Sequence, residues 1–177
     1  MARPLDPPPR QLTHEEYRAA PAPERALHFL CPDWTDPRNV GSVFRLADAV
    51  GATGLVLGGQ TPLPPHPKIA RTARATVRTV SWTHVPDCLE WLDDRRDLYV
   101  IGLEPTDRSQ SLFTFPLPPR PRPLLLVAGN ESAGLSPTLL SRCHATVHLP
   151  MYGQNSSMNV TTALAAAAYL LRAREAL

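Results

Sequence analysis

Three polar segments of this 177-residue chain hold the residues that could do chemistry, and each segment follows an apolar run. The first, "DPRNVGSVFR" (36–45), contains Asn39 and two arginines, Arg38 and Arg45, seven positions apart. On a helix this spacing places both arginines on one face. They could bind an anion or a polarised oxygen there. A solvated helix face is the alternative for either arginine taken singly.

The second segment is "GNESAGLSP" (129–137). Gly129 allows a backbone or a ligand to approach closely, and Gly134 permits a turn. Asn130 and Glu131 fall between the two glycines, where their polar side chains could face a ligand. A plain loop with turn residues is the alternative.

The third segment, "YGQNSSMNV" (152–160), leads directly into an apolar run rich in alanine. Ser156 or Ser157 can cap a helix that begins here. A helix N-terminus with spare N–H groups is also a good site for polar ligand atoms. Capping alone is the alternative. The alanines predict a helix that packs closely on another element or forms an interface.

Four cations occur at spacings of three, three and four within "PKIARTARATVR" (67–78). If this segment is helical, they lie on one side of the helix. A solvated face is the usual explanation, but cations without interleaved carboxylates repel one another, and phosphates would relieve that repulsion. The candidates for phosphate binding are Lys68, Arg71, Arg74 and Arg78.

The elements that must position these segments alternate along the chain. Continuous apolar runs predict strands at 26–31, 54–59, 98–104, 123–129 and 145–150. Capping and spacing signals predict helices at 13–20, 36–51, 86–96, 136–143 and 160–175. This order indicates an α/β fold with a mostly parallel sheet and helices on both faces. In such sheets ligands bind beyond the carboxyl ends of the strands, which here fall at Cys31, Leu57, Leu103, Ala128 and Leu149.

Length and proline placement define the organisation of the chain. The length suits one domain with a real core. Six of the 21 prolines lie in residues 1–23, and two further clusters lie in 61–67 and 116–123. Because proline breaks helices and central strands, we expect a short proline-rich N-terminal arm at 1–23, a domain at 24–177 and two surface loops.

Several classes of function are disfavoured by composition. The net charge of +2 neither demands nor forbids a nucleic-acid partner. No apolar run is long enough to span a membrane, and the N-terminus lacks the apolar core of a secretory signal. The three cysteines are far apart and odd in number, which fits neither a zinc site nor a disulfide framework. We therefore expect a cytoplasmic protein with no membrane partner and no metal.

Taken together and in order, three stretches resemble the motifs of the SpoU/TrmH branch of the SPOUT RNA methyltransferases. They are "DPRNVGSVFRLADAVGA", "LLLVAGNESAGLS" and "HLPMYGQNSSMNVTTALA". The resemblance covers about residues 24 to 175. It implies a single SPOUT domain with a C-terminal trefoil knot, and a homodimer with active sites near the subunit interface. It also implies methyl transfer from S-adenosylmethionine (SAM) to a ribose 2′-hydroxyl of tRNA or rRNA.

The resemblance assigns roles to individual residues. The catalytic positions are Arg45, Ser157, Asn159, Asn39 and Glu131, with Ser157 and Asn159 orienting Arg45. The cofactor contacts, largely through backbone groups, fall on Leu103, Gly129, Asn130, Leu149, Met151, Ser157 and Met158. RNA would contact Arg38, Lys68, Arg71, Arg74 and Arg78. Two positions depart from the family pattern, which usually has leucine in place of Met158 and glycine in place of Ala75.

The expected chemistry needs no metal, because the methyl group of a sulfonium is already activated. Arg45 is a poor base, since a guanidinium stays protonated in proteins. We therefore expect Arg45 to stabilise negative charge that develops on the 2′-oxygen, or to anchor the adjacent phosphate. We expect Glu131 to fix loop geometry by accepting backbone hydrogen bonds. The alternatives are a SPOUT enzyme that methylates a base and a non-catalytic RNA-binding protein with this fold. The sequence does not name the RNA or the nucleotide.

Overall fold

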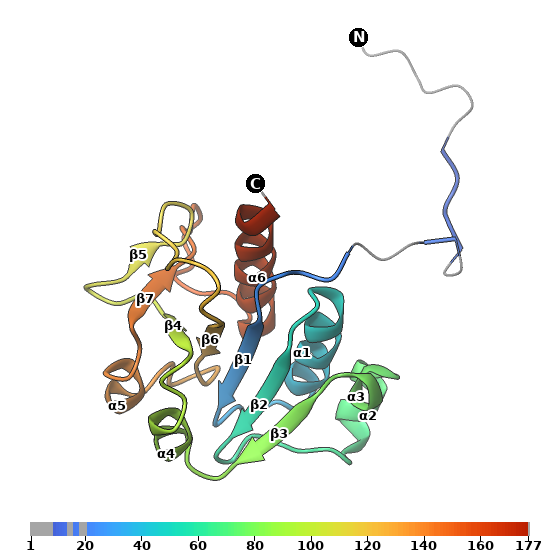
Figure 1. Cartoon of the computed structure of the whole chain (residues 1–177). Coiled ribbons are helices and arrows are strands. Elements are labelled where there is room, and N and C mark those ends of the chain that lie inside the picture. Colours follow the sequence, from blue (N-terminus) through green and yellow to red (C-terminus); the bar gives the residue numbers. More distant parts are fainter. Residues whose placement is uncertain (1–8, 14–15, 18–20, 177) are drawn as a thin grey trace.

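The computed structural model describes residues 9–13, 16–17 and 21–176 (Figure 1). The strands are β1 (Leu27–Pro32), β2 (Gly54–Gly58), β3 (Trp82–Val85), β4 (Tyr99–Leu103), β5 (Gln110–Ser111), β6 (Leu124–Ala128) and β7 (Ala145–His148). The helices are α1 (Pro37–Ala49), α2 (Pro67–Ala73), α3 (Thr76–Thr79), α4 (Cys88–Asp93), α5 (Pro137–Leu140) and α6 (Val160–Ala176).

The strands form one sheet in the order β3-β2-β1-β6-β4-β7-β5, and every pair of neighbours is parallel. From β1 the chain builds the sheet outward through β2 and β3, and the later strands build it in the other direction. The strand order therefore reverses between β1 and β6. Ligands of open parallel sheets bind at such a reversal, beyond the carboxyl ends of the strands.

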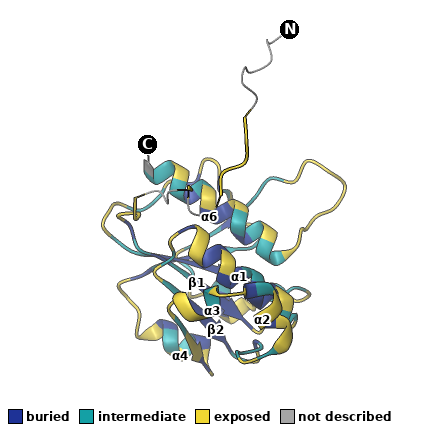
Figure 2. Ribbon diagram, turned by 90° about the vertical axis from the view of Figure 1, so that its right-hand side faces the viewer, coloured by how far each residue is buried: buried dark blue, intermediate teal, exposed yellow. Residues whose placement is uncertain are grey.

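Helices cover both faces of the sheet, as the sequence predicts. Successive side chains of a strand point to opposite faces. In β1, Phe29 packs in the core that includes α1 and α6, whereas Leu30 packs in the core that includes α4 and α5. Figure 2 shows the buried residues gathered on the strands and on the inner sides of α1 and α6.

Helix α1 begins and ends at the predicted signals. The side chain of Asp36 accepts a hydrogen bond from the backbone N–H of Arg38, and Pro37 occupies the first turn. Gly51, with φ +59°, lies just beyond the end. This backbone conformation favours glycine, so the chain turns into β2 at the predicted place.

Two short strands at the edges of the sheet were not predicted. Neither β3 nor β5 contains an apolar run long enough to stand out: β3 has two exposed residues, and β5 is two residues long. The predicted helix at 13–20 lies partly outside the described residues. Thr13 and Glu16 do form the reciprocal hydrogen bonds of a capping box, at 2.8 and 3.3 Å.

Candidate functional site

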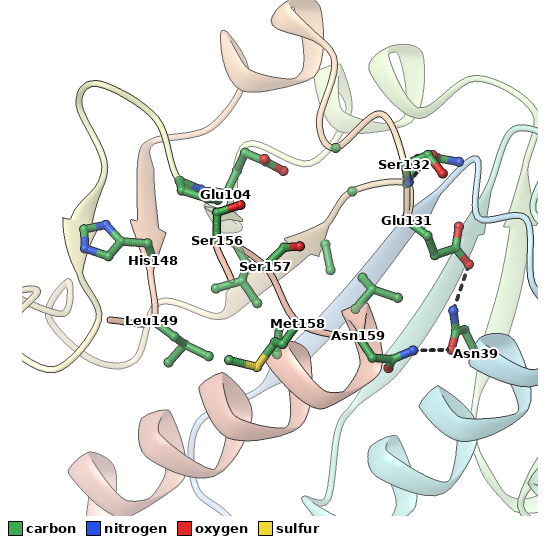
Figure 3. Close-up of a pocket in the computed structure, with 18 of the residues that line it drawn as sticks. Asn39, Glu104, Glu131, Ser132, His148, Leu149, Ser156, Ser157, Met158 and Asn159 are labelled. Atoms are coloured by element: carbon green, nitrogen blue, oxygen red, sulfur yellow. Dashed lines mark hydrogen bonds between the residues drawn. The ribbon is translucent and has the colours of Figure 1, made fainter. Parts of the chain in front are cut away.

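A cavity of about 440 Å³ opens at the carboxyl ends of the central strands (Figure 3). Four of the five predicted loops line it, namely those after β1, β4, β6 and β7. The loop after β2 is not among the lining segments. All seven predicted cofactor residues lie in the lining: Leu103, Gly129, Asn130, Leu149, Met151, Ser157 and Met158. These residues come from distant parts of the chain, and the fold brings them into one cavity.

A line of hydrogen-bonded side chains runs along one wall of the cavity (Figure 3). The amide of Asn159 donates from Nδ2 to Oδ1 of Asn39 at 3.0 Å. Nδ2 of Asn39 in turn donates to Oε1 of Glu131 at 2.9 Å. Asn39 is only 8% exposed. The three polar segments singled out in the sequence therefore meet through one side chain from each.

Glu131 is held by four donors from residues 35–39, at the start of the first polar segment. Its Oε2 accepts from the backbone N–H of Thr35 at 2.9 Å and from the Thr35 hydroxyl at 3.1 Å. Its Oε1 accepts from Asn39 and from the backbone N–H of Asp36 at 3.1 Å. Burial raises the pKa of the Glu131 carboxyl, but the hydrogen bonds from Asn39 and from the two backbone groups outweigh burial and lower it. This geometry favours the loop-fixing function that we expected for Glu131.

The loop after β6 depends on the absence of a side chain at Gly129. A Cβ there would lie 2.3 Å from the backbone carbon of Gly134, so the two chain segments could not approach as they do. Gly134 itself has φ +67°. The side chain of Asn130 closes the loop by accepting from the N–H groups of Ser132 and Ala133, each at 2.9 Å.

Two buried residues that support these loops were not predicted. Trp34 is fully buried, and its indole N–H donates to the carbonyl of Ala128 at 2.8 Å. The hydroxyl of Thr61 accepts from the backbone N–H of Trp34 and donates to the carbonyl of Cys31. Trp34 thus joins the loop after β1 to the loop after β6. No local motif indicates a contact between residues 94 positions apart.

The prediction that Ser156 or Ser157 caps α6 is wrong. Oδ1 of Asn159 accepts from the N–H groups of Thr161 and Thr162, at 3.0 and 3.2 Å, and so caps the helix. Asparagine reaches the first-turn N–H groups as well as serine does, and it lies nearer the start of the helix. Residues 151–159 are all exposed, and Tyr152 is 88% exposed. Ser156 and Ser157 line the cavity instead.

Arg45 is not among the residues that line the cavity. It is exposed on α1 and forms no hydrogen bond or ion pair with any described residue, so the expected contacts with Ser157 and Asn159 are not made within this chain. Arg38, seven residues earlier, pairs with Asp36 at the cavity wall at 2.8 Å. Arg45 therefore lies about two helical turns from the cavity, on the face of α1 that carries Arg38.

The other four predicted RNA contacts are exposed and lie beside α1, but they do not share one helix. Arg74 has φ +56° and ψ −125°, and Ala75 has φ −75° and ψ −20°. These are the angles of a type II′ turn, which ends α2 and separates Arg78 from Lys68 and Arg71. The hypothesis of one basic helical face across residues 67–78 is therefore wrong. Ala75, where the family pattern has glycine, has ordinary helical angles.

Close packing joins α2 to α1. Gly41 of α1 lies against α2, since a Cβ there would be 2.6 Å from Cβ of Thr72. The pKa of Asp36, which lines the cavity, is lowered mainly by its hydrogen bonds with Arg38 and also by the charge of Lys68. We define the basic surface as the exposed cations of these helices: Arg38, Arg45, Lys68, Arg71, Arg74 and Arg78.

Other routes to chemistry have little support in the described part of the chain. Burial raises the pKa of Cys88 and of Cys143 to about 11, so these thiols are protonated at neutral pH and poorly nucleophilic. Within residues 9–13, 16–17 and 21–176, no three His, Cys, Asp or Glu side chains form a group that could hold a metal ion.

Among the described helices, none is both long enough and apolar enough to cross a membrane.

Comparison with known families agrees with this geometry. The profile of the SpoU rRNA methylase family matches residues 26–169. The chain belongs to this family. The match includes β1 at one end and most of α6 at the other, and so contains all the loops that line the cavity.

Named relatives of this SpoU family chain act on ribosomal RNA. It is 35% identical over 155 residues to the 23S rRNA (uridine(2479)-2′-O)-methyltransferase of Streptomyces viridochromogenes, an alignment of 84% of this chain and 53% of the relative. It is 30% identical over 145 residues to the 23S rRNA (guanosine(2553)-2′-O)-methyltransferase RlmP of Bacillus subtilis, with 77% and 54% covered. The chain spans about half the length of these relatives.

Solved structures of other proteins share the fold. The SpoU methyltransferase AviRb of Streptomyces viridochromogenes, in complex with AdoMet, superposes with a TM-score of 0.75 at 29% identity, over 87% of this chain and 62% of that one. A structure described as giving insights into 2-OH methylation of C/U34 on tRNA superposes with a TM-score of 0.74 at 27% identity, over 86% and 97%.

Proposed function

We propose that this protein transfers a methyl group from SAM to a ribose 2′-hydroxyl of tRNA or rRNA. The observation that carries the proposal is the cavity: every predicted cofactor residue lines it, and Arg38 and Lys68 of the basic surface act on Asp36 in its wall. The named relatives are 2′-O-methyltransferases, which supports this reaction over methylation of a base.

The lining of the cavity fits SAM chemically. Leu103, Leu149 and Met158 offer apolar surface to a flat adenine ring. Gly129, Asn130 and Gly134 also lie in the lining, so backbone N–H and C=O groups of this loop can face a ligand. The family member AviRb has been crystallised with AdoMet. When bound, SAM supplies an activated methyl group, and this chain's own task is to hold the acceptor oxygen in line with it.

In this proposal Arg45 acts on the RNA and not on the cofactor. Its guanidinium is exposed as part of the basic surface, where it can contact the 2′-oxygen or the adjacent phosphate as negative charge develops. Arg45→Ala is expected to lower turnover about 100-fold and to leave the Kd of SAM nearly unchanged. Single-turnover methylation assays and calorimetry measure the two quantities. Equal turnover with and without Arg45 would reject this function.

We also propose that two copies of the chain form a homodimer with a trefoil knot in each subunit. The exposed aromatic residues of segment 151–159 and of α6 favour a dimer. Tyr152 is 88% exposed and Tyr169 is 55% exposed, and a second copy could cover them. A second copy that covers this surface would bring its own side chains toward the cavity, from which Arg45 of the same chain is remote. Sedimentation equilibrium tests the dimer. The unpaired cysteines remain our basis for expecting a cytoplasmic location.

Two glycines provide the test of the cofactor site. Gly129→Ala adds a Cβ that would meet backbone atoms of Gly134 and Leu135 at 2.3 and 2.5 Å, so the loop must move and SAM binding should be lost. Gly153→Ala is the matched control, because a Cβ there has no heavy atom within 4 Å and φ is not in the left-handed region. Calorimetry measures the Kd of SAM and of S-adenosylhomocysteine (SAH) for both variants. Failure of the wild-type protein to bind either ligand would favour a non-catalytic RNA-binding protein.

A further inference from the structure

The lining of the cavity includes three acidic side chains and one histidine, His148. Asp36, Glu104 and Glu131 lie in its lining, and within the described part of the chain no lysine or arginine does. Three carboxylates around one cavity favour a positively charged ligand, unless their charges are compensated locally. The neighbours of each carboxylate therefore decide what the cavity selects.

Two of the three carboxylates have no oxygen free for a ligand. Asp36 is paired with the charge of Arg38, whereas the donors to Glu131 are neutral and its charge remains. Four donors occupy both oxygens of Glu131, which fills the acceptor capacity of a carboxylate. Arg38 pairs with both oxygens of Asp36, at distances from 2.8 to 3.1 Å. Neither group has an oxygen to spare for a ligand without breaking these contacts.

Glu104 is different. Its Oε2 accepts one hydrogen bond, from the backbone N–H of Leu135 at 3.1 Å. None of the described residues donates to Oε1 or forms an ion pair with the carboxylate. Glu104 is half-buried, so its charge is less well screened than on an open surface. Among the lining residues drawn in Figure 3, it projects from the loop after β4.

The surrounding backbone is built to hold this carboxylate in place. The N–H of Glu104 donates to the carbonyl of Val147 at 2.9 Å, which fixes the residue between β4 and β7. Gly134 leaves room for the side chain, because a Cβ there would lie 2.8 and 2.9 Å from the two oxygens of Glu104. No motif in the sequence pointed to Glu104.

We propose that Glu104 gives the cavity its preference for positively charged SAM over uncharged SAH. The inference rests on the proposed function. SAM carries a sulfonium, an ammonium and a carboxylate, and so has one net positive charge. When the methyl leaves for the 2′-oxygen, the S–CH₃ bonding electrons stay on sulfur, and the ribose hydroxyl loses its proton to solvent. The product SAH therefore has no net charge, and the attraction to Glu104 ends with the reaction.

Calorimetric titration of SAM and SAH into wild-type protein, Glu104→Gln and Glu90→Gln tests this proposal. Glu90 is an exposed glutamate of α4 outside the cavity lining and serves as the matched control. Glu104→Gln should weaken SAM about tenfold, the effect of one nearby unit charge in a partly buried site, and SAH less than about twofold. Glu90→Gln should leave the ratio of the two Kd values as in the wild type.

The outcomes separate this inference from the proposed function. An unchanged ratio of the SAM and SAH Kd values in folded Glu104→Gln would overturn the inference. This includes an equal loss of affinity for both ligands, which would show that Glu104 acts without regard to charge. Thermal unfolding verifies the fold. Glu104→Ser is measured alongside as a second neutral variant, and Glu104→Asp, which keeps the charge, should restore most of the ratio. If wild-type protein binds neither ligand, the proposed function itself fails.

Discussion

Asn39, Glu131 and Asn159 form the polar framework of the site, one residue from each of the three segments that carry the family motifs. None of them is left with unused hydrogen-bonding atoms, since Asn159 also caps α6 and Glu131 also holds the backbone before α1. A change in any one of them is therefore expected to affect both the fold and the cavity.

Glu131→Gln tests this framework. The amide keeps one acceptor oxygen but replaces the other with a donor that faces the N–H and hydroxyl of Thr35. We expect a loss of about 1–3 kcal/mol in the free energy of unfolding at neutral pH, together with weaker SAM binding. Urea unfolding and calorimetry measure the two effects. Unchanged stability and unchanged SAM affinity would show that the framework does not depend on the carboxylate.

The lowered pKa of Glu131 predicts that the stability of the protein depends on pH. Because the pKa of Glu131 is lowered in the folded protein, its contribution is fully present above the unfolded-state value of 4.5 and is lost as pH falls through the lower folded-state value. The difference in unfolding free energy between the wild type and Glu131→Gln should therefore shrink as pH falls below about 4.5. Urea unfolding at a series of pH values measures it. A difference that grows on acidification would contradict the assignment.

At the level of residues, the sequence predicts the parts of the site that local motifs carry. The lining of the cavity could be predicted because its residues lie at the carboxyl ends of apolar strands or in the polar segments that follow them. Trp34, Thr61 and Glu104 could not, because each functions through a partner far away in the chain, such as Ala128, Cys31 or Leu135. The cap at Asn159 was missed because several polar residues precede α6, and spacing alone does not choose among them.

Among the elements, the junction of α2 and α3 is the clearest departure from expectation. The spacing of the cations would place them on one side of a continuous helix, but the chain makes a type II′ turn with an arginine at its first central position. Glycine is the preferred residue there, and an L side chain at positive φ is strained. We therefore propose that Arg74, which lies at a strained position on the basic surface, contacts RNA.

Arg74→Gly should therefore have opposite effects on stability and on RNA binding. The variant is expected to be more stable by about 1 kcal/mol, because the strain is relieved. RNA binding should weaken. The plot of the logarithm of the binding constant against the logarithm of salt concentration should become less steep by about one unit, as expected for the loss of one phosphate contact. Thermal unfolding and filter binding at several salt concentrations measure these effects.

Ala75→Gly is the matched control for this turn. Its helical angles do not require glycine, so it should be no more stable than the wild type and should bind RNA equally well. If the RNA affinities of Arg74→Gly and Ala75→Gly depended on salt in the same way, Arg74 would not contact RNA.

The end of α6 is anchored by a buried ion cluster. Glu175 accepts from Arg25 at 3.4 Å and from Arg172 at 3.2 Å, and the three side chains are at most 12% exposed. Both arginines also donate to backbone carbonyls, Arg172 to those of Val50 and Gly51 and Arg25 to those of residues 118, 119 and 122. The cluster thus joins α6 to the start of β1 and the end of α1.

Glu175→Gln should destabilise the fold by about 3 kcal/mol, because it leaves two buried cations without their counter-charge. Asp107→Asn is the control: it breaks an ion pair with Arg108 in which both side chains are at least 88% exposed, and it should leave the unfolding midpoint unchanged. Chemical denaturation compares the two variants. Equal stability of both would show that the cluster contributes no more than a surface pair.

On the scale of the whole molecule, one reversal of strand order creates the site. The loops after β1 and β6 meet where the sheet changes direction, and the loops after β4 and β7 complete the cavity. The alternation of apolar runs and helices was enough to predict a parallel sheet covered on both faces. It was not enough to predict the strand order or the two edge strands, which depend on contacts between distant segments and carry little apolar signal.

The central claim is that this cavity and the basic surface beside it methylate a ribose 2′-hydroxyl. Mass-spectrometric mapping of 2′-O-methylated nucleotides in total RNA, from cells with and without the gene, tests it most directly. The account predicts that at least one such nucleotide disappears from tRNA or rRNA without the gene, and that wild-type protein but not Arg45→Ala restores it. An identical set of 2′-O-methylated nucleotides in both cell lines would contradict the account.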